Sequence, residues 1–152
     1  MAELARTRVA PESLIFEVTE TTAVANMSAA RSFNDRLSEL GCRFALDDFG
    51  AGFGSFYYLK HLPFDFLKID GEFVRNCRVS QTDRLLIGAV VEIARGLQKK
   101  TVAEIVGDDE TVQLLTELGV DYGQGFHLGR PAPIEEAFAA TAPSPARARA
   151  AD

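Results

Sequence analysis

The sequence has few cysteines and no long apolar run, and both absences exclude classes of protein. Its two cysteines, Cys42 and Cys77, are far apart and lack Cys-x-x-Cys spacing. They therefore predict neither a disulfide framework nor a zinc site, and we expect each to be an ordinary buried side chain. No apolar run approaches the roughly 18 residues of a membrane helix, and the first residues lack the apolar core of a signal peptide. We therefore expect a cytoplasmic protein with no membrane partner.

Positive charge is also in short supply. The 152 residues include 16 lysines and arginines against 22 aspartates and glutamates, which gives a formal net charge of −6 and an isoelectric point near 5.0. This balance disfavours a protein that binds a nucleic acid polymer. Hydrophobic residues make up 47% and charged residues 25% of the chain, proportions typical of a folded protein. A chain of this length can bury roughly 68–70% of its unfolded surface, and we expect one domain.

Strand and helix patterns alternate along the chain. Runs of β-branched and aromatic residues predict short strands, while apolar residues repeated every three or four positions predict helices. Such alternation predicts an α/β fold of parallel strands joined by right-handed crossovers. About five strands are too few for a closed eight-stranded barrel of roughly 200–250 residues, so we expect an open sheet or an incomplete TIM-type (β/α) barrel. The expected strands are 14–18, 43–46, 64–69, 101–103 and 120–122, and the expected helices are 24–40, a short one near Tyr57, 82–97 with Leu86, Val90, Ile93 and Leu97 on one face, and 108–118.

Carboxylates stand at the ends of four successive expected strands. The C-terminal ends of parallel strands share one face of an α/β fold, where ligands bind, so we expect these acids to converge. Acids are also common at strand ends because they cap the helix that follows, and that alternative stays open for each acid taken singly. Their accumulated negative charge favours a bound cation, and oxygen ligands select hard ions such as Mg²⁺ or Mn²⁺. The acids are Glu17 and Glu20, Asp47 and Asp48, Asp70 close to Lys68, and Glu104.

The adjacent pair Asp47 and Asp48 is the most informative part of this pattern. Neighbouring strand residues point in opposite directions, but at a bend from strand to loop both carboxylates can reach one site, and one can bridge two ions roughly 3.5–4 Å apart. The glycine-rich segment 50–54 does not match the dinucleotide pattern, and it fits either a mobile loop over a metal site or a tight turn. His61 and His127 belong to no Ser/His/Asp or Cys/His constellation, which disfavours covalent nucleophilic catalysis.

Five segments resemble, in order and spacing, the EAL domain family. The Asp-Asp-Phe-Gly-x-Gly segment that begins at Asp47 is the most specific of them. The resemblance covers about residues 11–134, and it implies a modified (β/α)₈ barrel that hydrolyses the bacterial second messenger cyclic di-GMP to pGpG with two Mg²⁺ or Mn²⁺ ions. The segments are Phe-Glu-Val-Thr-Glu at 16–20, Leu-Asp-Asp-Phe-Gly-Ala-Gly at 46–52, Lys-Ile-Asp at 68–70, Val-Ala-Glu at 102–104, and Gln-Gly-Phe at 124–126 followed by Arg-Pro at 130–131.

The resemblance implies metal ligands. Glu17 would bind the first ion and Asp47 would bridge the two ions. Asp48 and Glu104 would lie on the side of the second ion. Two ions held in this way can lower the pKa of a shared water molecule and neutralise the phosphate as the ester oxygen leaves.

The resemblance also implies roles beyond the metal ions. Lys68 would contact the attacking water and the phosphate, with Asp70 as its acidic neighbour and Glu104 as a further catalytic group. Glu20 would anchor the loop that begins at Phe49. Contacts with the substrate at the edge of the site would come from Gln124, Phe49 and Arg130.

The sequence departs from the family pattern in three ways. The Glu-Ala-Leu segment that names the family is absent, and so is a metal-binding asparagine, because nothing before Glu17 offers either. The usual Ala-Glu-Gly-Val-Glu reads Ala-Glu-Ile-Val-Gly at 103–107, so that Ile105 replaces a glycine and Gly107 a glutamate. We therefore expect a partial EAL domain over 11–138, after an extension at 1–10 and before a disordered tail, rich in Ala and Pro, at 139–152.

These departures leave two functional interpretations open. The first is a cyclic di-GMP phosphodiesterase domain that is weakly active or inactive as this chain. The second is a degenerate module that binds cyclic di-GMP or a protein partner without catalysis. An incomplete barrel exposes strand edges and core, so we expect a partner to cover them: a second copy in a homodimer, or a missing N-terminal segment. A sensor domain is a further candidate partner.

Overall fold

The computed structural model of the chain describes residues 6–7, 9–50, 59–133 and 135. Three expectations lie outside these residues: the short helix near Tyr57, most of the glycine-rich segment 50–54, and the tail at 139–152. No helix among the described residues is long and apolar enough to cross a bilayer. Both cysteines are buried and free, as expected.

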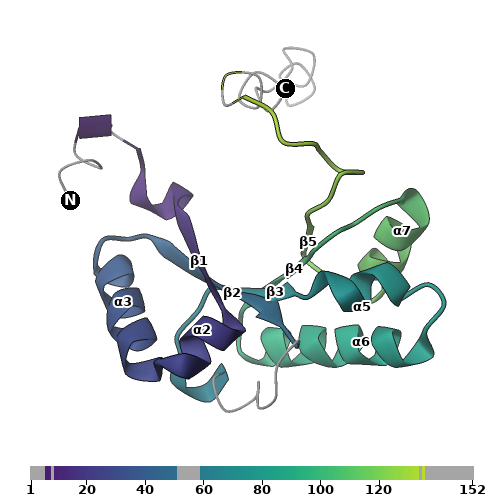
Figure 1. Ribbon diagram of the computed structural model, residues 1–152, viewed down its shortest axis with the longest axis horizontal. Coiled ribbons are helices and arrows are strands. Elements are labelled where there is room, and N and C mark those ends of the chain that lie inside the picture. Colours follow the sequence, from purple (N-terminus) through teal and green to yellow (C-terminus); the bar gives the residue numbers. More distant parts are fainter. Residues whose placement is uncertain (1–5, 8, 51–58, 134, 136–152) are drawn as a thin grey trace, which may run out of the picture.

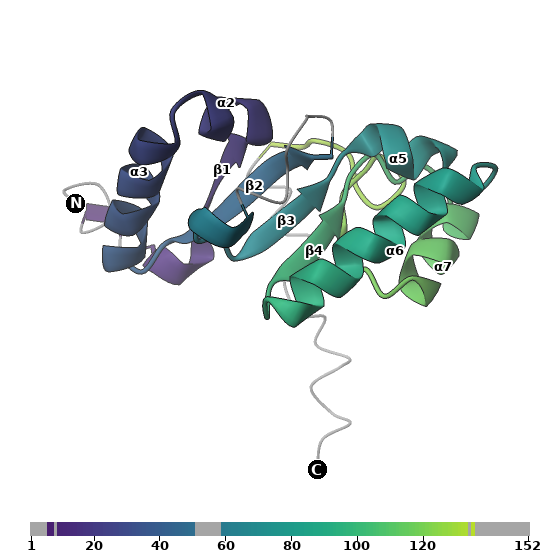
Figure 2. The same cartoon turned by 90° about the horizontal axis from the view of Figure 1, so that it is seen from below.

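Five parallel strands form one sheet in chain order, which confirms the predicted α/β class (Figure 1). Because neighbouring strands are consecutive and crossovers are right-handed, the connecting helices are expected on the same side of the sheet. Figures 1 and 2 show this arrangement for α3, α6 and α7. The strands are β1 (Ile15–Thr19), β2 (Arg43–Phe49), β3 (Phe66–Ile69), β4 (Lys100–Ala103) and β5 (Tyr122–Gly123). The helices are η1 (Pro11–Ser13), α2 (Glu20–Ala25), α3 (Met27–Glu39), α5 (Gly71–Asn76), α6 (Gln81–Gly96) and α7 (Asp109–Glu117).

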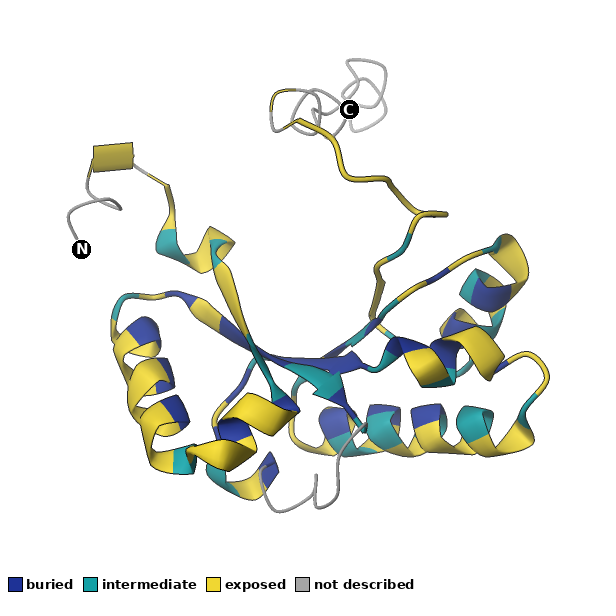
Figure 3. Ribbon diagram, viewed as in Figure 1, coloured by how far each residue is buried: buried dark blue, intermediate teal, exposed yellow. Residues whose placement is uncertain are grey.

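Alternation along the strands divides the sheet into two faces. Side chains such as Phe44, Leu46 and Leu67 point towards the helices and are completely buried there. Figure 3 shows buried residues along the middle strands of the sheet and on the helices that cover it. The alternate residues line a groove of about 470 Å³ along the opposite face, where Ile15 is 46% and Tyr122 54% exposed. The sheet is therefore a partial barrel wall with one covered face and one open face, and its edges are β1 and β5. A partner that covers the open face stays a prediction.

Two helix predictions need correction. The helix expected over 24–40 is two helices, because Asn26 ends α2 and caps α3 by accepting a hydrogen bond from the Ala29 N–H at 3.0 Å. The face expected on α6 is confirmed only in part. Val90 and Ile93 are half-buried and pack against the core, whereas Leu86 and Leu97 are exposed. The fully buried residues of the helix are Ile87, Val91 and Ala94. A glycine ends the turn after α3: Gly41 has a φ of +82°, in the left-handed region that favours glycine.

A reciprocal clamp joins the start of β4 to the residue before β5. The Asp121 carboxylate accepts hydrogen bonds from the Thr101 N–H at 2.9 Å, the Thr101 hydroxyl at 3.0 Å and Lys100 Nζ at 2.6 Å. In return, the Asp121 N–H donates to Thr101 Oγ1 at 3.1 Å. Burial by itself would raise the pKa of Asp121, but the bonds from Lys100 and Thr101 outweigh it and lower that pKa below its ordinary value of 3.8. This clamp fixes β5 on the sheet edge.

We predict that Asp121→Ala lowers the free energy of unfolding by about 1–3 kcal/mol at pH 7, because it leaves the buried Thr101 donors unpaired. The pKa of Asp121 is lower in the folded than in the unfolded chain. The stability that its ionised carboxylate contributes is therefore complete above pH 3.8 and is lost as the pH falls through the folded pKa. Urea unfolding at pH 7 and pH 3 measures both effects. Asp35→Ala, which removes an exposed aspartate of α3, is the matched control and should leave stability nearly unchanged. Equal losses in the two variants would contradict the clamp.

Candidate functional site

A bulge in β2 brings the two adjacent aspartates to one place. In the register between β2 and β3, Leu46 pairs with Leu67 and Phe49 with Ile69, so Asp47 and Asp48 together lie opposite the single residue Lys68. Asp48 absorbs the extra residue with a φ of +54°, a left-handed conformation that aspartate tolerates better than most residues. The alternation of side chains is broken there, and both carboxylates can reach the same site.

Lys68 lies at the centre of the acidic site. Its side chain is only 5% exposed, and its Nζ atom lies 2.9 Å from Glu17 Oε2, 2.7 Å from Asp47 Oδ1 and 2.5 Å from Glu104 Oε1. These acids come from β1, from β2 and from the end of β4. Burial alone would lower the pKa of the Lys68 ammonium, but the contacts with Asp47, Glu104 and Glu17 outweigh it and hold that pKa above its ordinary value of 10.5. Lys68 is therefore a fixed positive charge at neutral pH.

Three carboxylates beside Lys68 could share one cation. Asp47, Asp48 and Glu104 each place an oxygen within 4.8 Å of the other two. Asp47 Oδ1 is buried and, despite its charge contact with Lys68, has no hydrogen bond of normal geometry among the described residues. A set of donors made only of carboxylate oxygens fits a hard divalent ion such as Mg²⁺ or Mn²⁺. Glu17 is not part of this triad, and the structure turns its carboxylate to Lys68.

The pKa shifts in this triad have the sign expected of crowded acids. Burial is the main influence on Asp48 and raises its pKa above 3.8, and the charges of Asp47 and Asp70 raise it further. Burial also raises the pKa of Glu104 above 4.5, where Lys68 opposes the shift and Asp47 adds to it. Both groups resist ionisation without a further cation. The triad is therefore electrostatically poised to take up positive charge.

Three other expected site residues occupy supporting positions. Glu20 is buried and accepts a hydrogen bond from the Gly50 N–H at 3.1 Å, at the start of the loop that it was expected to anchor. Asp70 caps α5 by accepting from the Glu72 N–H at 2.7 Å, so the capping alternative describes its hydrogen bond. Phe49 is only 2% exposed and packs in the core under the helices, because the bulge moves its side chain to the face that regular alternation would have given to Asp48. The expected contact between Phe49 and a substrate stays a prediction, which the burial of its side chain does not favour.

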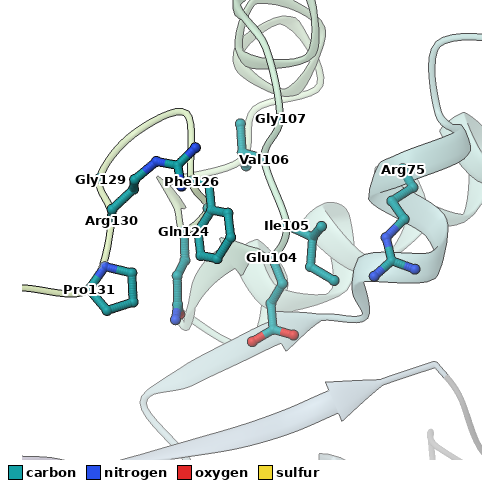
Figure 4. A pocket seen from close by; sticks show the side chains of 11 residues that line it. Arg75, Glu104, Ile105, Val106, Gly107, Gln124, Phe126, Gly129, Arg130 and Pro131 are labelled. Atoms are coloured by element: carbon teal, nitrogen blue, oxygen red, sulfur yellow. The ribbon is translucent and has the colours of Figure 1, made fainter.

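A pocket of about 760 Å³ opens beside Glu104 (Figure 4). Gln124 and Arg130, both expected at the edge of the site, line it, and the Arg130 guanidinium lies 5.1 Å from the centre of the Phe126 ring. Arg75, on α5, lines it as well. Sequence reasoning quoted Phe126 only as part of a motif and missed Arg75, because a single charged helix residue carries no signal of a pocket.

Comparison with known proteins places this chain in a family. Residues 1–131 match the profile of the EAL domain. The chain belongs to the EAL domain family. It is 42% identical over 123 residues to the cyclic di-GMP phosphodiesterase PdeB of Shewanella oneidensis, which covers 81% of this chain and 14% of that protein. It is 40% identical over 131 residues to the cyclic di-GMP phosphodiesterase PdeF of Escherichia coli, which covers 86% of this chain and 18% of that protein.

Solved EAL domains have the same arrangement of strands and helices. The PaMucR phosphodiesterase in complex with c-di-GMP matches with a TM-score of 0.82 at 40% identity, covering 90% of this chain and 55% of that chain. A manganese and cyclic di-GMP complex of BlrP1 from Klebsiella pneumoniae matches with a TM-score of 0.82 at 31% identity. The match covers 86% of this chain and 33% of that chain. The EAL chain described here thus spans about half of the first structure and under a fifth of the two curated relatives. Its sheet is part of the TIM-like barrel of this family.

We predict that Asp48→Asn is neutral or stabilising when metal is removed with EDTA at pH 7. The raised pKa of Asp48 means that the folded state binds its proton more tightly, so stability falls as the pH rises above 3.8 through the folded value. Asparagine removes the charge and tolerates the same left-handed backbone. Thermal melts in EDTA at pH 7 and pH 3.5 test this, and the gain should vanish at the lower pH. A large loss of stability at pH 7 would contradict the charge argument.

Proposed function

We propose that this chain is the part of an EAL-type cyclic di-GMP phosphodiesterase domain that holds divalent metal and the scissile phosphate. The observation that carries the proposal is the convergence of Asp47, Asp48 and Glu104 within 4.8 Å of one another beside Lys68. The relatives named above support the substrate, since they are described as cyclic di-GMP phosphodiesterases or as complexes with that dinucleotide.

The acids of the site would bind two metal ions, each with its own set of ligands. Asp47, Asp48 and Glu104 would hold one Mg²⁺ or Mn²⁺ ion, and Glu17 would bind a second with Asp47 between them. When bound, such ions supply positive charge to a phosphodiester and lower the pKa of a water molecule. The Glu17 carboxylate lies 2.9 Å from the Lys68 ammonium, so it would have to leave Lys68 to bind an ion on that side. The bulge at Asp47 and Asp48 places both carboxylates for this task.

Lys68 acts as a hydrogen-bond donor and a fixed positive charge rather than as a base. Its raised pKa keeps the ammonium protonated, so it cannot accept the proton of an attacking water. It can donate a hydrogen bond to a phosphate oxygen once divalent ions take over the carboxylates that hold it. Asp70 serves this site indirectly, because it caps α5 and its charge raises the pKa of Asp48. Glu20 positions the start of the adjoining loop through the Gly50 N–H.

The pocket beside Glu104 suits one base of a nucleotide. It combines an aromatic face from Phe126, two guanidinium groups from Arg75 and Arg130, and the amide of Gln124 (Figure 4). Aromatic and guanidinium planes stack on nucleobases, and the base edges can pair with amides. Because Glu104 also lines this pocket, a nucleotide base held there would bring its phosphate towards the metal ligands.

Binding without turnover is the second candidate. Ile105 and Gly107 stand where the family pattern has glycine and glutamate, and no asparagine precedes Glu17. Only Glu17 and Asp47 are then left to hold the ion on the Glu17 side. Since a misplacement of 1 Å can cost about 10²-fold in rate, this chain alone should hydrolyse the substrate very slowly or not at all.

We predict that the chain binds Mn²⁺ and that Asp47→Asn weakens this binding by roughly tenfold or more, equivalent to about 1.4 kcal/mol or more. Calorimetric titration measures the affinity, and chromatography of pGpG after incubation with cyclic di-GMP and Mn²⁺ measures turnover. Binding of the dinucleotide with little or no pGpG is the expected result.

Two control variants make this outcome decisive. Glu104→Gln removes an acid of the triad, whereas Glu117→Gln removes an exposed acid of α7 and should change nothing. Indistinguishable Mn²⁺ heats for the unmodified chain and Asp47→Asn would overturn the shared site. Robust pGpG formation that Glu104→Gln abolishes would overturn the low activity proposed for this chain.

A further inference from the structure

Ile105, the residue after Glu104, has an unusual backbone. Its φ is +55°, in the left-handed region, where a β-branched residue is a genuine outlier. Strained residues of this kind persist only where the surrounding structure over-determines them, and they gather at functional sites. Ile105 connects the end of β4, which carries Glu104, to Val106, which lines the same pocket. What holds this turn therefore decides where Glu104 points.

Gly71 provides the space that holds Ile105. A Cβ atom added at Gly71 would lie 2.3 Å from Ile105 Cδ1, 2.6 Å from Cγ1 and 3.1 Å from Cβ, so the isoleucine side chain fills the position that any other residue would need. Gly71 is buried at the first turn of α5, and its φ lies outside the left-handed region. Glycine is therefore required there by the contact with Ile105 and not by its own backbone.

The other side of the turn is held by β5. The Val106 N–H donates to the Gln124 carbonyl oxygen at 3.0 Å, and Val106 is almost completely buried. A Cβ atom at Gly125 would lie 2.2 Å from the Val106 carbonyl oxygen, so the two backbones are in direct contact. The segment 104–106 is thus packed between α5 on one side and the end of β5 on the other. Figure 4 shows Ile105 between Glu104 and α5, away from Phe126.

We propose that Ile105 is a positioning residue for Glu104. Its side chain, seated in the space above Gly71, locks the left-handed turn after β4, and the locked turn aims the Glu104 carboxylate at Lys68 and towards Asp47. The lock itself rests on packing alone, while its consequence for metal binding rests on the proposed function. Because Ile105 is also 44% exposed and lines the pocket, the same side chain forms an apolar wall beside the metal ligands.

Two substitutions, made singly and together, test the lock. The change in melting temperature caused by Gly71→Ala should reverse its sign when Ile105 is replaced. Alanine is a better helix former than glycine, so Gly71→Ala should raise the melting temperature unless the new methyl group meets Ile105. We expect Gly71→Ala to lower the melting temperature of the metal-free chain and to raise it in the Ile105→Gly background, which lacks the three atoms nearest to the new methyl group. Gly88→Ala is the matched control, because a Cβ there meets only one atom, 4.0 Å away, in α6. It should raise the melting temperature in both backgrounds.

Mn²⁺ affinity, measured well below the melting temperature, tests the positioning of Glu104. Partners that orient a metal ligand typically contribute 10–100-fold to affinity. Gly71→Ala should therefore weaken Mn²⁺ binding by about tenfold, and by less than about threefold in the Ile105→Gly background. Ile105→Val keeps the β-branched carbons over Gly71 and should bind Mn²⁺ nearly as the unmodified chain does. Hydrogen exchange at the Val106 amide should quicken in Gly71→Ala and in Ile105→Gly, and adding Gly71→Ala to Ile105→Gly should not quicken it further.

Each remaining outcome has a definite meaning. If Gly71→Ala changes stability equally with and without Ile105, the lock does not exist. If the effect of Gly71→Ala on the melting temperature reverses its sign but every folded variant binds Mn²⁺ equally, Ile105 is only a packing residue and its positioning role is overturned. If the unmodified chain takes up no Mn²⁺, the proposed function fails together with the positioning role, while the stability cycle still decides the lock.

Discussion

One buried ammonium group organises the site of this EAL domain. Lys68 is in the central strand of the sheet and contacts the carboxylates of Glu17, Asp47 and Glu104, which come from three separate segments of the chain. Acids at this spacing repel one another unless a cation lies between them. Without a divalent ion, Lys68 is that cation. The geometry of the acidic site therefore depends on a residue that binds no metal itself.

Two departures from regular backbone adapt the sheet to this charge. The bulge at Asp47 and Asp48 turns two neighbouring acids to one site, and the left-handed turn at Ile105 directs the chain away from β4 directly after Glu104. Both lie at the C-terminal ends of parallel strands, where α/β folds place their ligands. Regular strands would have directed one aspartate of the pair to the opposite face, among the packed helices.

Sequence reasoning predicted the strands and the convergence of the acids well, and the local geometry less well. Alternating patterns predicted the five strands, and acids at strand ends had to converge because parallel strands end at one edge of the sheet. The bulge was not predictable in the same way, because it depends on the register with β3. On α6 the expected face is correct for Val90 and Ile93, but the way the helix lies on the sheet centres the buried face on Ile87 and Val91. Phe49 lies within a specific motif, yet the bulge turns its side chain into the core.

Thermal and urea unfolding of Lys68→Met, in EDTA and with saturating Mn²⁺, test the central role of this ammonium group most directly. Methionine keeps an unbranched side chain but removes the charge, so in EDTA we expect a loss of about 3–5 kcal/mol, as for a broken buried ion pair. With Mn²⁺ the loss should fall to less than half, because the ion replaces the missing charge, and the exposed control Lys100→Met should show no such difference. Equal losses in EDTA and Mn²⁺, or no loss in EDTA, would contradict the role assigned to Lys68.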